Sequence, residues 1–158
     1  MTHPVPKMVA YVACNPADLQ RRCQFGCIGC GCCDAVCPQE CITVFNPHGV
    51  AEIMESKCIG CGACVDACPQ GIIHLREAGS PIVVKCSNRD PGKVARTACE
   101  ASCISCGICE KFCPSGAAKV VSNLSAINEE LCLSCGMCAV KCPRHAIYDL
   151  RGILTPPR

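Results

Sequence analysis

Short apolar stretches alternate with polar turns along this chain, which predicts many brief strands and few long helices. Runs rich in Val and Ile open two segments, residues 8–15 and 81–88, and β-branched residues favour extended backbone. Similar runs flank a polar break within residues 42–54 and again within residues 119–127. Each of these two ranges is therefore expected to form a hairpin.

Each opening strand is expected to lead into a short helix. An Asn or Asp followed by Pro marks a helix start, and this pair follows both strands, with Asn15 and Asp90 as the expected caps. The predicted helices cover residues 17–22 and 93–99. Each half of the chain should then end on a closing strand, and these are predicted at residues 72–75 and 146–150.

The two halves of the pattern correspond closely enough to indicate an internal duplication. The segments MVAYVACN and PIVVKCSN align so that Cys14 stands opposite Cys86. Gly79, Ser80 and Pro81 form a short linker between the halves. We therefore expect an α+β fold of two tandem modules, residues 1–79 and 80–158, each with a short strand–helix extension at its N-terminus.

Composition shows that a conventional core cannot hold this chain together. The 158 residues include 22 cysteines but only 3% aromatic side chains, so there is little large apolar surface to bury. Disulfides, zinc and iron–sulfur clusters all use this much cysteine. Disulfides need an oxidising compartment, and the apolar stretch near the N-terminus is too short for a secretion signal or a membrane span. We expect a cytoplasmic chain with reduced thiols and no transmembrane segment.

One cysteine motif, C-x2-C-x2-C-x3-C-P, occurs four times and uses 16 of the 22 cysteines. Three thiolates on one tight loop can hold three corners of an iron–sulfur cubane, and the fourth, expected on the short helix that follows, reaches the neighbouring cluster. Zinc sites usually combine two C-x2-C pairs across a long spacer instead. The sequence therefore favours four [4Fe–4S] clusters. Their predicted ligands are Cys27, Cys30, Cys33, Cys37, Cys58, Cys61, Cys64, Cys68, Cys103, Cys106, Cys109, Cys113, Cys132, Cys135, Cys138 and Cys142.

The fourth cysteine of each motif is expected to complete the cluster of the other motif in the same half. Each half then holds two clusters. The predicted ligand sets are Cys27, Cys30 and Cys33 with Cys68; Cys58, Cys61 and Cys64 with Cys37; Cys103, Cys106 and Cys109 with Cys142; and Cys132, Cys135 and Cys138 with Cys113.

Six cysteines lie outside the motif. Cys32 and Cys41 align with apolar residues in the other copies, so both are expected to be packing residues. The other four recur at matching positions in both halves, and several interpretations stay open for them. They are small buried residues lining the clusters, S–H donors that tune cluster potential, ligands of a fifth cluster, or disulfide partners. These four are Cys14, Cys23, Cys86 and Cys99.

No catalytic constellation accompanies the cysteine motifs. The 4 histidines share no spacing typical of a metal site. No Gly-rich phosphate loop, nucleophile elbow or carboxylate pair stands out either. We therefore expect neither a catalytic site of the chain's own nor a nucleic-acid partner.

Longer stretches around the motifs resemble a known family. The paired motifs are similar to bacterial-type ferredoxins with two clusters, which implies a (βαβ)2 fold for each module. VAYVACN followed by RRCQFGCIGCGCCDAVCP, and later VVKCSNRDPGKVARTACEASCISCGICEKFCP, resemble the iron–sulfur part of the B component of Rnf-type electron transport complexes. That resemblance implies a polyferredoxin that relays electrons between reduced ferredoxin and a flavin- or NAD-linked partner. It carries over the sixteen motif cysteines as ligands.

The B component of that family also has an N-terminal membrane helix and an upstream cysteine motif, which this sequence does not show. We therefore expect an electron-transfer subunit of an anaerobic oxidoreductase complex, with partner subunits of flavin, NAD, hydrogenase or formate dehydrogenase type. A freely diffusing ferredoxin-type carrier and a membrane-associated Rnf-like subunit lacking its anchor stay open as alternatives.

Charge favours the complex over the free carrier. The 15 basic and 13 acidic residues give the apo-chain a net charge of +2. Each oxidised cluster with its four thiolates adds about two negative charges, so four clusters bring the chain to about −6. Diffusing bacterial ferredoxins are usually far more acidic, which helps to steer them to partners.

Overall fold

In the computed structural model, which describes residues 7–15, 23–44 and 49–154, the strands pair within each half of the chain. The first half contains β1 (Met8–Val12), β2 (Ile42–Thr43), β3 (Glu52–Ile53) and β4 (Ile73–Glu77). β1 pairs antiparallel with β4, from Met8 opposite Glu77 to Val12 opposite Ile73. β2 pairs antiparallel with β3, which confirms the first predicted hairpin.

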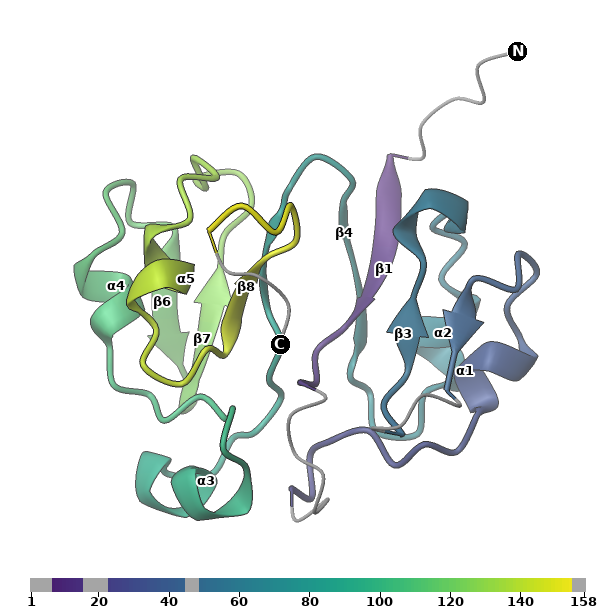
Figure 1. The fold of residues 1–158 in the computed structure, drawn as a ribbon, viewed down its shortest axis with the longest axis horizontal. Coiled ribbons are helices and arrows are strands. Elements are labelled where there is room, and N and C mark those ends of the chain that lie inside the picture. The colour runs from purple at the N-terminus through teal and green to yellow at the C-terminus, as the bar shows by residue number, and fades with distance from the viewer. Residues whose placement is uncertain (1–6, 16–22, 45–48, 155–158) are drawn as a thin grey trace.

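The second half shows the same pairing. It contains β5 (Ile82–Val84), β6 (Ala118–Val121), β7 (Leu124–Ile127) and β8 (Ile147–Asp149). β5 pairs with β8, and β6 pairs with β7 as the second predicted hairpin. Ser122 and Asn123 both have positive φ between β6 and β7, as the tight hairpin turn requires. In both halves the opening strand therefore lies against the closing strand (Figure 1).

The helices are short, and most of them start inside a cysteine motif. They are α1 (Cys32–Ala35), α2 (Ala63–Ala67), α3 (Gly92–Ala98), α4 (Ile108–Lys111) and α5 (Met137–Lys141), with one 3-10 turn at Glu55–Lys57. Small helices mixed with antiparallel strands confirm the predicted α+β class. Within the described ranges, no helix has the length and apolar character needed to cross a membrane.

Helix α3 confirms the prediction for residues 93–99, but its expected cap is wrong. Pro91, not Asp90, precedes the first helical residue, and no side chain caps the helix. The Asp90 N–H instead donates to Asn88 Oδ1 at 2.8 Å, in the local turn that short polar side chains favour. Gly92 starts the helix because a Cβ there would collide with the carbonyl of Ile104 in the neighbouring cysteine loop. The helix predicted at residues 17–22 lies outside the described residues, so the expected role of Asn15 as its cap stays a prediction.

Each half buries its own small core, in which cysteines take the place of large apolar side chains. In the first half Cys33, Cys58 and Cys64 pack among Val and Ile side chains of the strands. In the second half Cys103 and Cys138 do the same. Cysteines therefore make up part of the core of each half.

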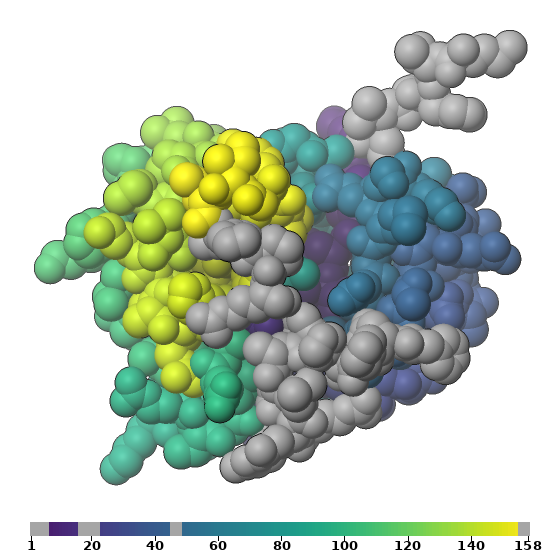
Figure 2. Space-filling model, in the orientation of Figure 1, coloured from purple at the N-terminus to yellow at the C-terminus, as the bar shows by residue number. Residues whose placement is uncertain are grey.

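The two halves of the chain are called lobes from here on. They contact each other where β1 and β5 end. The Ser87 hydroxyl donates to the Ala13 carbonyl at 2.8 Å, and the Asn15 side-chain amide donates to the Tyr148 hydroxyl at 2.8 Å. Figure 1 and Figure 2 show the lobes side by side, the first in blue and the second in green and yellow. Residues next to Cys14 and Cys86 therefore take part in the contact between the lobes.

Arg76 of β4 is a buried cation that binds the linker between the halves. Its side chain is only 2% exposed and pairs with the carboxylate of Glu55. The guanidinium also donates to the carbonyls of Glu77 at 2.9 Å and Ser80 at 2.7 Å. The strand end and the linker are therefore held by one side chain.

Arg76→Met should lower the thermal midpoint of the cluster-loaded protein by several degrees. The change leaves two partly buried carbonyls without a donor and the Glu55 carboxylate without its partner, at a cost of about 2 kcal/mol. Arg89→Met is the matched control, because Arg89 is exposed and its guanidinium donates to the carbonyl of Val121 at the surface. Differential scanning calorimetry under argon measures both, and equal midpoints for the two variants would contradict the role assigned to Arg76.

Candidate metal centres

The structure corrects the expected position of the motif cysteines on the helices. The fourth cysteine follows the helix and does not lie on it: α1 ends at Ala35 before Cys37, and α4 ends at Lys111 before Cys113. The third cysteine lies on the helix instead, as its second residue. A glycine in the left-handed conformation immediately precedes all four of these helices and starts each of them inside the motif.

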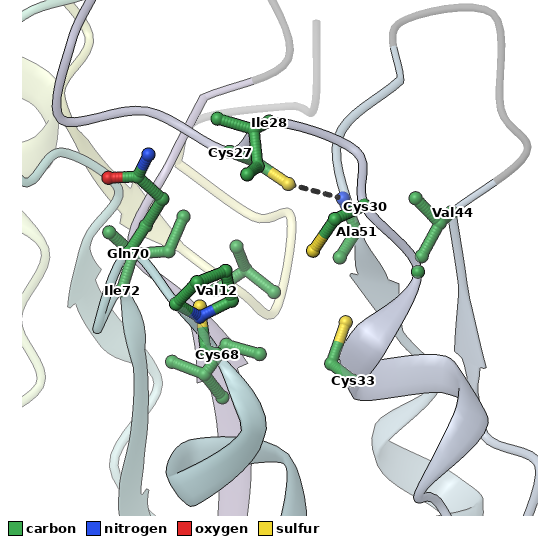
Figure 3. A pocket seen from close by; sticks show the side chains of 13 residues that line it. Val12, Cys27, Ile28, Cys30, Cys33, Val44, Ala51, Cys68, Gln70 and Ile72 are labelled. Carbon is green, nitrogen blue, oxygen red and sulfur yellow. Dashed lines mark hydrogen bonds between the residues drawn. The ribbon is translucent and has the colours of Figure 1, made fainter.

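The first cysteine group surrounds a cavity in the first lobe. Cys27, Cys30, Cys33 and Cys68 line a space of about 350 Å³, counting the part open to solvent. Figure 3 shows their sulfurs directed into this space, with Cys68 approaching from the side opposite the loop. The Ala51 N–H donates to Cys27 Sγ at 3.5 Å from the edge of the cavity.

Two further cavities have the same construction, and each is about 330 Å³ in volume. Each joins three cysteines of one motif to the fourth cysteine of the other motif in the same lobe. They are lined by Cys58, Cys61 and Cys64 with Cys37, and by Cys103, Cys106 and Cys109 with Cys142.

The thiols of the remaining motif act on one another. Burial is the main cause that raises the pKa of Cys138 to about 11, and the nearby thiols of Cys132, Cys113 and Cys109 contribute to the same rise. In the other three groups, too, the fourth cysteine of the partner motif contributes to raising the pKa of the buried third cysteine, after the larger effect of burial. These pairs are Cys33 with Cys68, Cys64 with Cys37, and Cys109 with Cys142.

The thiols within one group differ in acidity. Burial raises the pKa of Cys33 to about 11. Burial also acts to raise the pKa of Cys37 and Cys113, but backbone N–H groups outweigh it and leave the pKa of both below the usual thiol value. Since only the thiolate binds metal, loading these groups with metal releases protons.

The donor sets fit an iron–sulfur cluster. Each set consists of four soft sulfur ligands, with neither His nor carboxylate among them, a combination that suits zinc or iron–sulfur chemistry. A single zinc ion would draw four sulfurs to about 2.3 Å from one point. The sulfurs of three sets line cavities of about 330 to 350 Å³, which suits a cluster of several atoms.

Backbone amides point at the cysteine sulfurs. The Ala10 N–H donates to Cys58 Sγ at 3.4 Å, and the Ala146 N–H donates to Cys142 Sγ at 3.3 Å. The first of these contacts needs Gly60, where a Cβ would collide with the carbonyl of Met8 on β1. Hydrogen bonds to cluster sulfurs raise the reduction potential because they stabilise the more negative reduced state.

Ser125→Ala should lower the potential of one cluster by about 40 mV. The Ser125 hydroxyl lies 3.3 Å from Cys109 Sγ in a buried position, and about 1 kcal/mol of hydrogen-bond energy corresponds to this shift for one electron. Ser115→Ala provides the graded control, because its hydroxyl lies 3.6 Å from Cys113 Sγ and is less buried. Redox titration followed by electron paramagnetic resonance measures both, and an unchanged set of potentials in Ser125→Ala would refute this prediction.

Cys32 and Cys41, which align with apolar residues in the other copies of the motif, differ in burial. Cys41 is buried, as predicted, with its sulfur 3.4 Å from that of Cys37. Cys32 is exposed, so its prediction as a packing residue is wrong. It starts α1 on the outer face, because the adjacent Cys33 is the residue that points inward. The four recurring cysteines outside the motif lie together where the lobes meet.

Comparison with known families agrees with this chemistry. One profile, described as a 4Fe–4S dicluster domain, matches residues 26–72 and 57–117, and a second of the same description matches residues 102–147. The first profile alone spans more than half of the chain. The chain therefore belongs to the 4Fe–4S dicluster ferredoxin family, whose clusters transfer electrons. The match at 57–117 crosses between the halves, whereas strand pairing and cavities group the motifs within each half.

A curated relative confirms the resemblance to the Rnf family. The B component of the Na+-translocating ferredoxin:NAD+ oxidoreductase complex of Acetobacterium woodii is 42% identical over 79 residues, which are 50% of this chain and 23% of that protein. The matched stretch is thus about a quarter of the relative's length. Among solved structures, the formate dehydrogenase–heterodisulfide reductase–formylmethanofuran dehydrogenase complex from Methanospirillum hungatei matches over 78% of this chain and 52% of its own, with 22% identity and a TM-score of 0.31.

Proposed function

We propose that this chain relays single electrons through four [4Fe–4S] clusters held by its sixteen motif cysteines, as a subunit of an anaerobic oxidoreductase complex. The observation that carries this proposal is the grouping of the cysteines. In three of the four sets a cavity is lined by three cysteines of one motif and the fourth cysteine of its partner, and the thiol of Cys113 lies near that of Cys138 of the remaining set. When bound, each cluster takes up and releases one electron without breaking a bond.

The proposed organisation is two duplicated (βαβ)2 modules, residues 1–79 and 80–158, with two clusters in each. In both halves the opening strand pairs antiparallel with the closing strand, β1 with β4 and β5 with β8, which supports this division. Arg76 and the linker that it holds lie at the proposed boundary. Reduced thiols require a reducing compartment, so the proposed location is the cytoplasm.

The chain's own residues bury most of each site and leave one corner near the surface. The third cysteine is buried in all four motifs, whereas the second is exposed in all four. An electron can thus enter or leave each site at the exposed corner. These exposed second cysteines are Cys30, Cys61, Cys106 and Cys135.

Apolar side chains beside these corners support a place within a complex. Ile28 is 50% exposed, Ile59 is 53% exposed and Leu133 is 68% exposed, and each directly follows the first cysteine of its motif. Exposed apolar side chains around a redox centre are suited to docking on a protein partner. We propose partner subunits of flavin, NAD, hydrogenase or formate dehydrogenase type, consistent with the Rnf relative.

Anaerobic size-exclusion of native extract tests the assignment to a complex. We expect the chain to elute together with other redox proteins, well above its own 16.6 kDa. Elution of all the iron-loaded chain at 16.6 kDa would favour the freely diffusing carrier instead.

A further inference from the structure

A fourth cysteine-lined cavity lies between the lobes, and no motif cluster accounts for it. Its volume is about 480 Å³, larger than the 330 to 350 Å³ of the motif cavities. Each lobe contributes two cysteines from outside the motifs to its wall, one after the opening strand and one before the first motif ligand. They are Cys14 and Cys23 from the first lobe and Cys86 and Cys99 from the second.

Corresponding cysteines of the two lobes accept equivalent hydrogen bonds. Cys14 Sγ accepts the N–H of Cys27 at 3.4 Å, and Cys86 Sγ accepts the N–H of Cys103 at 3.3 Å. Cys27 and Cys103 are the first cysteines of one motif group in each lobe, and Cys27 lines the central cavity as well as its own. The central cavity therefore lies directly between two motif sites, one in each lobe.

Buried N–H groups donate to the cysteine sulfurs of the central cavity, as they do to the motif sulfurs. Asn88, only 1% exposed, donates its backbone N–H to Cys86 Sγ at 3.4 Å and its side-chain amide to Cys23 Sγ at 3.5 Å. One side chain of the second lobe thus binds a sulfur of the first. N–H donors aimed at sulfur stabilise a thiolate more than a thiol.

A cation lies beside the same space. Lys85 lines the cavity, with its ammonium 5.4 Å from the centre of the Tyr148 ring. A cluster with four thiolates carries about two negative charges, which a neighbouring cation offsets.

We propose that Cys14, Cys23, Cys86 and Cys99 hold a fifth [4Fe–4S] cluster, which joins the clusters of the two lobes into one continuous path. The inference rests on the proposed relay, because it gives an electron a route from the Cys27 site to the Cys103 site. Transfer along this route moves one electron from a reduced centre to an oxidised neighbour, with no bond made or broken.

Iron and acid-labile sulfide per chain, measured after anaerobic purification, test the proposal. We expect about 20 irons in the wild-type chain, and about 16 in Cys14→Ala, in Cys86→Ala and in the double variant, because both cysteines serve one centre. Cys32→Ala is the control. It removes an exposed cysteine outside the motif that lines none of the cysteine cavities, so it should keep about 20 irons.

Three outcomes would overturn the fifth cluster. The first is about 16 irons in the wild type and in every variant, which leaves the four-cluster relay intact. The second is one zinc per chain that Cys14→Ala loses. The third is a disulfide between two of the four cysteines, detected by mass spectrometry without reduction. A wild-type chain with no iron would refute the relay itself, so the two failures are distinguishable.

Discussion

Cys68→Ala should remove the cluster of the Cys27 group, in the motif that precedes its own. Cys68 lines the cavity of Cys27, Cys30 and Cys33, whereas the cavity of its own motif takes Cys37. We expect the variant to lose about four irons, which is one whole cluster. The loss of a ligand from an S4 site is among the largest effects a single substitution can have here.

Double variants separate cross-ligation from ligation within one motif. Cys27→Ala with Cys68→Ala should lose no more iron than either change alone, because both residues serve one cluster. Cys58→Ala with Cys68→Ala should lose about eight irons, because these residues serve two clusters. The reverse pattern, one cluster lost with Cys58 and two with Cys27, would show that each motif holds its own cluster.

Removal of iron should unfold the protein. The cores contain cysteines where an ordinary domain has large apolar side chains, and the largest fully buried apolar residues are only Ile and Val. Binding free energy is folding free energy in such small metal domains. Anaerobic chelation should therefore abolish both the cooperative thermal transition and the β-sheet circular dichroism signal.

Zinc addition to the chelated protein provides a control for this prediction. Zinc binds thiolates but cannot fill a cavity shaped for a cluster, so it should restore less structure than iron with sulfide. An apo-protein that keeps a cooperative thermal transition would show that the cysteine cores are stable without clusters.

The strands and hairpins could be predicted from the sequence because they depend on residues close together in the chain. The Val- and Ile-rich segments form strands as expected, both as opening strands and in the hairpins. The motif also indicated which cysteines meet, since the fourth cysteine of such a motif ligates the other cluster in two-cluster ferredoxins. The structure brings Cys68 and Cys142 to the cavities that this reasoning assigned to them.

Other features depend on contacts that sequence spacing does not encode. Asp90 looked like a helix cap, but its N–H donates to Asn88 Oδ1 in a local turn, and Pro91 precedes the first residue of α3. Cys32 looked like a packing residue, but the adjacent Cys33 takes the inward direction. The meeting of Cys14 with Cys86 depends on how the lobes pack, and their recurrence in both halves was the one signal that pointed to it.

Anaerobic titration with a stoichiometric one-electron reductant tests the central claim most directly. We predict that the fully loaded chain takes up at least about four electrons in separate one-electron steps, one for each motif cluster. Each step should bleach the charge-transfer absorption and add one paramagnetic centre. Uptake of fewer than about four electrons by a chain that carries its full iron would contradict a relay built from these sixteen cysteines.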